Sequence, residues 1–155
     1  MNIERRTLPE QHYLYVDREC AFDGKAIGDA MASGFGEVFG FAGKNGIAPL
    51  SMPMSVYLEM PGDRLRFRAG VIVGKADAAR AGGAVKAGAL PAGEVLTATH
   101  VGPYASLNQS HKALWDYAEK HDLPKAMPVW EIYVDDPTTK PEADVRTEIF
   151  RALNG

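Results

Sequence analysis

Two residues able to do chemistry, Glu131 and Tyr133, lie in the apolar stretch PVWEIYVDDP at residues 128–137. This stretch reads as a buried strand bounded by prolines, and a carboxylate inside it is costly unless something compensates its charge. Strand alternation puts Glu131 and Tyr133 on one face and Trp130 on the other. The face of Glu131 is predicted to line a cleft, and the face of Trp130 is predicted to pack against a helix.

Two chemistries fit a glutamate and a tyrosine in an apolar cleft. An ionised Glu131 could hold a cationic aromatic ligand, and Tyr133 would add a cation–π contact of about 0.5–2 kcal/mol. Alternatively, Glu131 could be a general base for an attacking water, with Glu148 or a tyrosine assisting, if the strand register lets Glu131 and Glu148 meet. A third interpretation pairs Glu131 with an arginine such as Arg68 and assigns it no ligand.

The other reactive residue types form no recognised site. The histidines His12, His100, His111 and His121 have no metal-ligand spacing, so no metal site and no cofactor are predicted. His100 and His111 are interpreted as residues at the margin of the core or on the surface. Cys20 is the single cysteine, which excludes an intramolecular disulfide.

Composition indicates one ordinary globular domain. The chain has 155 residues, of which 46% are hydrophobic and 24% charged, and its net charge is −3. A slightly acidic chain without a basic run is not expected to bind nucleic acid. No stretch approaches the roughly 20 apolar residues that span a bilayer, and the N-terminus lacks the apolar core of a signal peptide. The expected location is therefore the cytoplasm.

The hydrophobic pattern predicts two long helices among several strands. The first helix follows Asp23, its expected N-cap, to about residue 44, although four glycines between 34 and 43 weaken it. Either close packing against a neighbour or a break in the helix would explain those glycines. The second helix follows Gly102-Pro103 and ends near residue 121. Strands are predicted at 11–17, 54–60, 64–73, 94–102, 129–135 and 145–153.

This order repeats as strand, helix, strand, strand in two halves. The first half covers about residues 1–75, the second about 94–155, and an Ala- and Gly-rich connector at 76–93 carries a short strand or an irregular segment. Prolines begin equivalent elements 75 and 76 residues apart, at 53 and 128 and at 61 and 137. The pattern predicts an α+β fold with pseudo-twofold symmetry and antiparallel strands.

The ordered set HVGPY (100–104), PVWEIYVDDP and VRTEIF (145–150) resembles the GyrI-like, or gyrase-inhibitor-like, family. That family shares its domain with the effector-binding halves of multidrug-sensing transcription activators. The resemblance is strongest over residues 94–153 and stays collinear over 1–74. It implies a single GyrI-like domain over residues 1–155, with a ligand cleft between its two halves.

The resemblance also implies roles for single residues. GyrI-like proteins bind bulky aromatic, often cationic, molecules, and a buried glutamate at the position of Glu131 compensates the positive charge of the ligand. A second acid often stands at the position of Glu148. Arg68 is a departure, because relatives often carry an acid there, and an arginine that pairs with Glu131 or Glu148 would reduce the preference for cationic ligands. The other candidate ligand-binding residues are Trp130, Tyr133, Tyr104 and Phe150.

The expected function is to bind hydrophobic aromatic small molecules, for sequestration or detoxification. The Trp130–Glu131 pair also resembles a subgroup of stand-alone members that hydrolyse strained electrophiles containing a cyclopropane ring, with Glu131 as general base. Two alternatives belong to other classes, a regulatory protein that inhibits a partner such as DNA gyrase and a carrier of haem or another tetrapyrrole. The sequence shows no DNA-binding domain of the kind that precedes this one in the sensors.

Overall fold

The protein is an α+β chain in which pairs of strands are separated by helices. The computed structural model describes residues 2–59 and 62–153. The strands among these residues are β1 (Glu4–Leu8), β2 (Gln11–Ala21), β3 (Met54–Tyr57), β4 (Arg64–Val73), β5 (Lys86–Leu90), β6 (Gly93–Val101), β7 (Val129–Tyr133) and β8 (Arg146–Ala152). The helices are α1 (Gly24–Lys44), α2 (Lys75–Ala78) and α3 (Leu107–Lys120), with single 3-10 turns η1 (Tyr104–Ser106) and η2 (Glu142–Asp144).

The described strands form one antiparallel sheet in the order β1-β6-β8-β7-β3-β4-β2-β5. From the outside of the sheet towards its middle, one set of strands runs β6, β8, β7 and the other runs β2, β4, β3. In each set the first strand in the chain lies outermost, the third lies next to it, and the second lies at the middle. The predicted repeat is therefore confirmed as β2-α1-β3-β4 and β6-α3-β7-β8. The two sets of strands meet where β3 pairs with β7.

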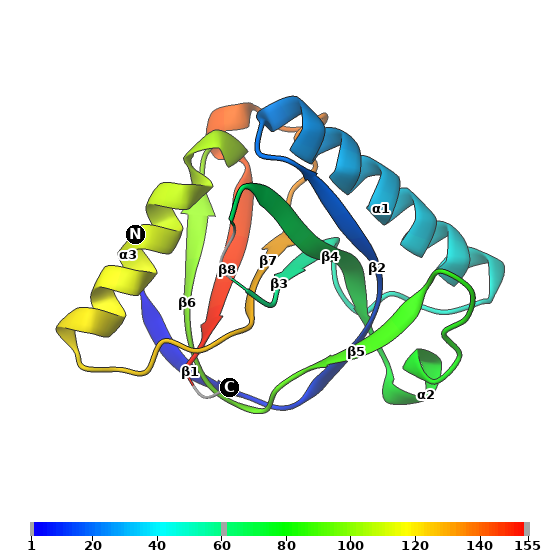
Figure 1. Cartoon of the computed structure of the whole chain (residues 1–155), viewed down its shortest axis with the longest axis horizontal. Coiled ribbons are helices and arrows are strands. Elements are labelled where there is room, and N and C mark those ends of the chain that lie inside the picture. Colours follow the sequence, from blue (N-terminus) through cyan, green and yellow to red (C-terminus); the bar gives the residue numbers. More distant parts are fainter. Residues whose placement is uncertain (1, 60–61, 154–155) are drawn as a thin grey trace.

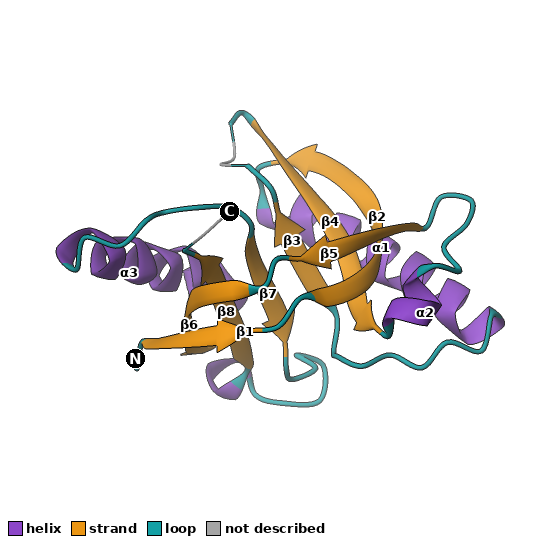
Figure 2. Cartoon of the chain, turned by 90° about the horizontal axis from the view of Figure 1, so that it is seen from below, coloured by secondary structure: helices purple, strands orange, loops and turns teal. Residues whose placement is uncertain are grey.

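Each set is completed at its edge by a strand from outside it. β1 precedes the first set in the chain but pairs with β6 of the second. β5, from the segment between the sets, pairs with β2 of the first (Figure 2). β5 is the short strand expected in the connector, whereas β1 is absent from the predicted strands, because its polar sequence ERRTL has no buried face to reveal it.

α1 is continuous over 21 residues despite its glycines. Asp23 caps its N-terminus as predicted, because the Asp23 carboxylate accepts from the Ala26 amide at 2.9 Å. Gly34 faces β4, and a Cβ there would lie 2.6 Å from the Cβ of Ala69. Close packing thus explains this glycine, whereas a Cβ at Gly40 would meet nothing within 4 Å.

Both long helices lie on the same face of the sheet and diverge from ends that lie close together (Figure 1). Leu114 of α3 packs in one apolar cluster with Tyr133 of β7, and Met31 and Phe35 of α1 reach that cluster too. The inner stripe of α3 and the middle of α1 therefore enclose the same part of β7.

The opposite face of the sheet carries its own apolar cluster, to which none of the described helices contributes. There Trp130 stacks on Phe150, with ring centroids 5.2 Å apart and planes 6° from parallel. The prediction that Trp130 faces the helices is wrong, because β7 turns Glu131 and Tyr133 towards them instead. Both faces of β7 are apolar enough to be buried, so alternation separates the two faces without telling which one the helices cover.

Candidate functional site

Glu131 lies at the centre of the sheet, where the two sets of strands join. It is only 5% exposed. Its partner across the β3–β7 ladder is Ser55, which is fully buried on the same face. A carboxylate at such a position needs several hydrogen-bond donors, because an uncompensated buried charge is strongly unfavourable.

Two tyrosines, placed symmetrically about the Ser55–Glu131 pair, donate to one oxygen of the carboxylate. Tyr57 follows Ser55 by two residues and Tyr133 follows Glu131 by two, so the antiparallel register puts one on each side. The Tyr133 hydroxyl donates to Oε1 at 2.6 Å and the Tyr57 hydroxyl at 3.3 Å. The Tyr133 hydroxyl has a single proton, which it donates to Glu131. In the hydrogen bond between Ser55 and Tyr133, 3.0 Å long, Ser55 Oγ is therefore the donor.

The other oxygen of Glu131 is held by His111 of α3, whose Nε2 lies 2.5 Å from Oε2. An ionised carboxylate only accepts, so the hydrogen lies on Nε2. Sequence-based interpretation places His111 at the margin of the core or on the surface and does not predict this contact. A signal for it exists in the spacing, because His111 follows Leu107 by four residues and precedes Leu114 by three, on the inward stripe of α3.

The two tyrosines are fixed hydrogen-bond donors. Burial raises the pKa of Tyr133 well above its ordinary value of 10.0, and the negative charge of Glu131 raises it further. The pKa of Tyr57 is raised well above 10.0 by the same two causes in the same order. Both hydroxyls therefore keep their protons at neutral pH and support a negative charge on Glu131.

Aromatic rings surround the buried carboxylate. The Tyr104 ring lies edge-on to that of Tyr133, with centroids 5.3 Å apart, and the Phe35 ring is 5.8 Å from the same ring. Tyr104 is 37% exposed, which makes it the most accessible of these rings. The surroundings of Glu131 thus combine apolar aromatic surface with one negative charge.

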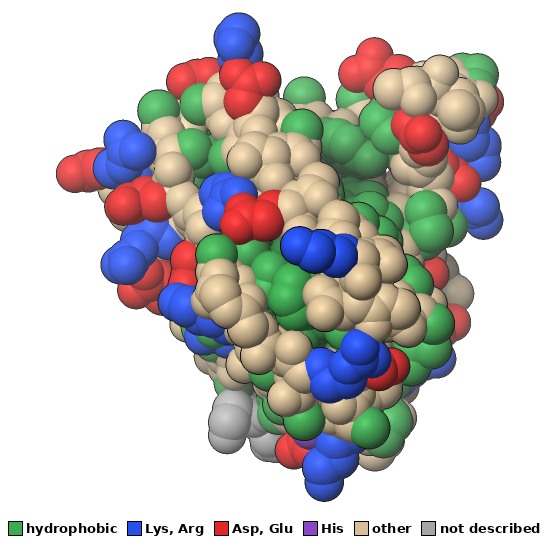
Figure 3. All heavy atoms as spheres, turned by 90° about the vertical axis from the view of Figure 1, so that its right-hand side faces the viewer, with side chains coloured by type: hydrophobic (Ala, Val, Ile, Leu, Met, Phe, Trp, Pro, Cys, Tyr) green, Lys and Arg blue, Asp and Glu red, His purple; other side chains and the backbone are tan. Residues whose placement is uncertain are grey.

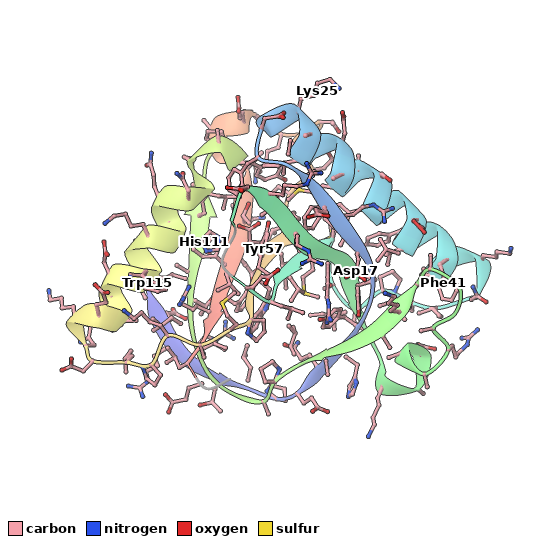
Figure 4. The ribbon with its side chains drawn as sticks, in the orientation of Figure 1. Asp17, Lys25, Phe41, Tyr57, His111 and Trp115 are labelled. Atoms are coloured by element: carbon pink, nitrogen blue, oxygen red, sulfur yellow. The ribbon has the colours of Figure 1, made fainter. Side chains whose placement is uncertain are left out.

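His111 is the more accessible member of the His111–Glu131 pair. The His111 side chain is 24% exposed, against 6% for that of Glu131. His111 on α3 and Tyr57 on β3 both lie towards the middle of the molecule (Figure 4). The side that carries α1 is hollowed near the end where α1 begins, and hydrophobic side chains line that hollow (Figure 3).

A buried histidine fixes the start of α3 and so the position of His111. His100 Nδ1 lies 2.6 Å from Ser110 Oγ, and its Nε2 lies 3.1 Å from the Pro103 carbonyl oxygen. Ser106 Oγ donates to the same carbonyl oxygen at 2.9 Å. Because Ser110 directly precedes His111, this network sets the rotation of the first turn of α3 relative to β7.

The structure brings Tyr133 and Tyr104 to Glu131 but places the other predicted ligand-binding residues elsewhere. Glu148 pairs with Ile132, so it lies on the face of Trp130 and Phe150 and does not meet Glu131. Arg68 donates to the Tyr13 hydroxyl at 2.9 Å and stacks on the Tyr15 ring, also on that face. Arg68 therefore does not neutralise Glu131. The residues placed away from Glu131 are Trp130, Glu148, Phe150 and Arg68.

A separate open hollow of about 520 Å³ lies beside β2 and the β3–β4 hairpin. Its walls carry arginines and acids in similar numbers, and Glu131 is not among them. The chemistry of Glu131, rather than the size of this hollow, identifies the candidate site.

Within residues 2–59 and 62–153, no group of three His, Cys, Asp or Glu side chains could hold a metal ion. No helix of the same residues is long and apolar enough to cross a membrane.

Comparison with known proteins gives one family match. The model of the family described as "GyrI-like small molecule binding domain" matches residues 1–153. No curated protein matches the chain.

Several solved structures share the fold. The EcmrR C-terminal domain superposes with a TM-score of 0.79 at 18% identity, over 99% of this chain and 97% of that one. A hydrolase from Listeria innocua gives 0.67 at 18% identity, over 98% and 91%. SAV2435 bound to tetraphenylphosphonium gives 0.65 at 13% identity, over 100% and 95%. Identities this low show likeness of fold alone.

Proposed function

This chain belongs to the GyrI-like family of small-molecule-binding domains, and from that membership we propose that it binds hydrophobic aromatic cations at Glu131, for sequestration or detoxification. The observation that carries the proposal is the buried Glu131 carboxylate, which is held by hydroxyls on Oε1 and by His111 on Oε2 and lies near the partly exposed Tyr104 ring. A buried negative charge beside aromatic rings favours a ligand that is both cationic and apolar. SAV2435, a protein of the same fold, holds such a cation.

Titration calorimetry with tetraphenylphosphonium tests the proposal. Glu131→Gln keeps the size of the side chain but removes its charge, and we expect it to weaken binding at least tenfold, or by about 1.4 kcal/mol. Glu148→Gln is the matched control, because Glu148 lies on the opposite face of the sheet and its loss should leave the affinity unchanged. Equal affinity of Glu131→Gln and the wild type would contradict the proposal.

A second candidate function, hydrolysis of cyclopropane-type electrophiles, is favoured by the donors around the carboxylate. In this reaction Glu131 removes a proton from water while the water oxygen bonds to a ring carbon. The ring C–C bond breaks, and its electron pair passes into a conjugated carbonyl of the substrate. Tyr57, 3.3 Å from Glu131, protonates the resulting carbanion and regains the proton from Glu131.

Product analysis separates the two candidates. The protein is incubated with a cyclopropane-bearing alkylating compound, and the ring-opened product that carries one added water is measured. Hydrolysis predicts turnover that Glu131→Gln abolishes and Tyr57→Phe slows. Wild-type protein that binds the compound without forming this product acts by sequestration.

The two remaining alternatives, a haem carrier and an inhibitor of a partner protein, require different features of the chain. A haem carrier needs an imidazole free to ligate iron. His100 and His111 are both engaged with neighbouring side chains, whereas His121 is exposed. A Soret band after addition of haem would support a carrier. Inhibition of a partner such as DNA gyrase should survive Glu131→Ala, because it would act through the surface.

A further inference from the structure

We propose that His111 is the resident counter-cation of Glu131, which an incoming cationic ligand displaces, so that ligand binding releases a proton. The inference rests on the proposed function and concerns how the same site admits its ligand. It makes His111 the residue that sets the pH range and the charge preference of binding.

The donors to Glu131 differ in how easily they can be displaced. Those on Oε1 belong to paired strands, where Tyr133 is 6% exposed and its partner Ser55 is fully buried. The donor on Oε2 is a single side chain from a helix, and His111 is 24% exposed. A cation arriving from solvent therefore meets Oε2 first, and it can take over this oxygen without disturbing the sheet.

Histidine is also the residue type that changes its charge between pH 5 and 8. The tyrosines around it stay neutral in that range, because burial raises the pKa of Tyr57, Tyr133 and Tyr104. Four titratable side chains lie near His111 on other elements: Glu131 and Tyr133 from β7, Tyr57 from β3 and Tyr104 from η1. Two cations lie close to it as well. Arg151 of β8 stacks on Trp115, one turn further along α3, and Lys112 pairs with Asp116 on α3 itself.

The charges around the site determine the direction of the effect. A protonated His111 and an ionised Glu131 together are neutral, so an added cation would leave two positive charges sharing one carboxylate. Loss of the His111 proton removes that repulsion. Binding of a permanent cation is therefore coupled to release of up to one proton, and its affinity falls by at most about tenfold per pH unit as the pH decreases.

Calorimetry with tetraphenylphosphonium measures this coupling, because the ligand itself has no titratable proton. Titrations at several values between pH 5.5 and 8.5, each in two buffers of different ionisation enthalpy, give the number of protons released. For the wild type we expect binding to release protons, up to one for each bound cation. The affinity should rise with pH over the same range.

Three variants isolate His111 from other groups. His111→Gln keeps a neutral donor near Oε2 and should bind with no proton release and a flat pH profile. His111→Lys supplies a permanent cation and should bind at least tenfold more weakly than the wild type at pH 8. His121→Gln is the control, since His121 is an exposed imidazole beyond the end of α3 and stacks on Tyr117.

Each outcome of the experiment decides something. Wild-type binding without proton release, or proton release that persists in His111→Gln, overturns the inference but leaves the proposed function in place. Absence of binding at every pH overturns the proposed function and the inference with it. NMR titration of the His111 ring gives a second measurement on the unmodified protein, and an unchanged ring titration on saturation with ligand also contradicts the inference.

Discussion

Glu131 receives hydrogen bonds from three elements, and these bonds are unequal. The Tyr133 hydroxyl is close, buried and supported by Ser55, whereas the Tyr57 hydroxyl lies 3.3 Å away on the other side. Hydrogen bonds to charged groups contribute about 1.5–3 kcal/mol, and their strength falls as they lengthen. The two tyrosines occupy symmetric positions but are not equivalent in energy.

Removal of the two hydroxyls separately tests this difference. Tyr133→Phe also leaves the buried Ser55 hydroxyl without its partner, and we expect the free energy of unfolding to fall by about 2–3 kcal/mol. Tyr57→Phe removes one long hydrogen bond and should cost less than about 1 kcal/mol. Urea denaturation at pH 7 measures both values, and a larger loss in Tyr57→Phe would contradict the geometry.

Among the elements, α1 approaches the sheet most closely at Gly34. Gly34 lets its backbone approach Ala69 of β4, and a methyl group at residue 34 has no room unless the helix moves away. Gly40 lies on the exposed side of the same helix and imposes no such limit. The two glycines therefore have opposite effects on stability.

Alanine substitution at each position measures these effects. Gly34→Ala should lower the free energy of unfolding by about 1–3 kcal/mol, because overpacking displaces the helix. Gly40→Ala should raise it by up to about 1 kcal/mol, because alanine favours the helical conformation. Thermal and urea denaturation of both variants against the wild type give the comparison, and equal shifts would show that α1 does not pack as described.

The loop between β7 and β8 is held by Asp135. Its carboxylate accepts from Arg146 Nε at 2.9 Å, from the Arg146 backbone amide at 3.0 Å, and from Lys140 Nζ at 3.1 Å. Hydrogen bonds from the Arg146 guanidinium, followed by that from Lys140, hold the pKa of Asp135 well below its ordinary value of 3.8.

A carboxyl whose pKa is lower in the folded than in the unfolded chain stabilises the fold at pH values above its unfolded pKa. This contribution is lost as the pH falls from about 4 through the folded value. Asp135→Asn should therefore lower Tm at pH 7, and its difference from the wild type should shrink between pH 4 and pH 2. Glu142→Gln, an exposed acid of the same loop, is the control. A difference that is independent of pH would contradict the role of the charge.

For the whole molecule, the sequence predicts the repeat, the strands of both sets and the face shared by Glu131 and Tyr133. These follow from periodicity within single elements. The contact between His111 and Glu131 could not be predicted in the same way, because it depends on how α3 is rotated over β7. The positions of Glu148 and Arg68 depend on the register between strands, which side-chain patterns leave open.

The edge strand β1 offers a test at the scale of the sheet. Deletion of residues 2–8 removes five register pairs with β6 and the apolar contact of Leu8. It exposes the edge of β6, which is free to pair with another chain. We expect self-association in light scattering and a lower urea midpoint. Arg5→Ala, which removes only the exposed Arg5–Glu94 ion pair, should remain monodisperse if the wild type is, and should lose less than about 1 kcal/mol.

The register that pairs Ser55 with Glu131 also limits which residues the two halves can carry at their equivalent central positions. Two identical halves would place glutamate opposite glutamate at the centre of the sheet, where like charges on directly paired residues repel. A serine on one side avoids this repulsion and supplies the hydroxyl that supports Tyr133. A doubled scaffold thus presents a single charge, and the expected stoichiometry is one cation for each chain.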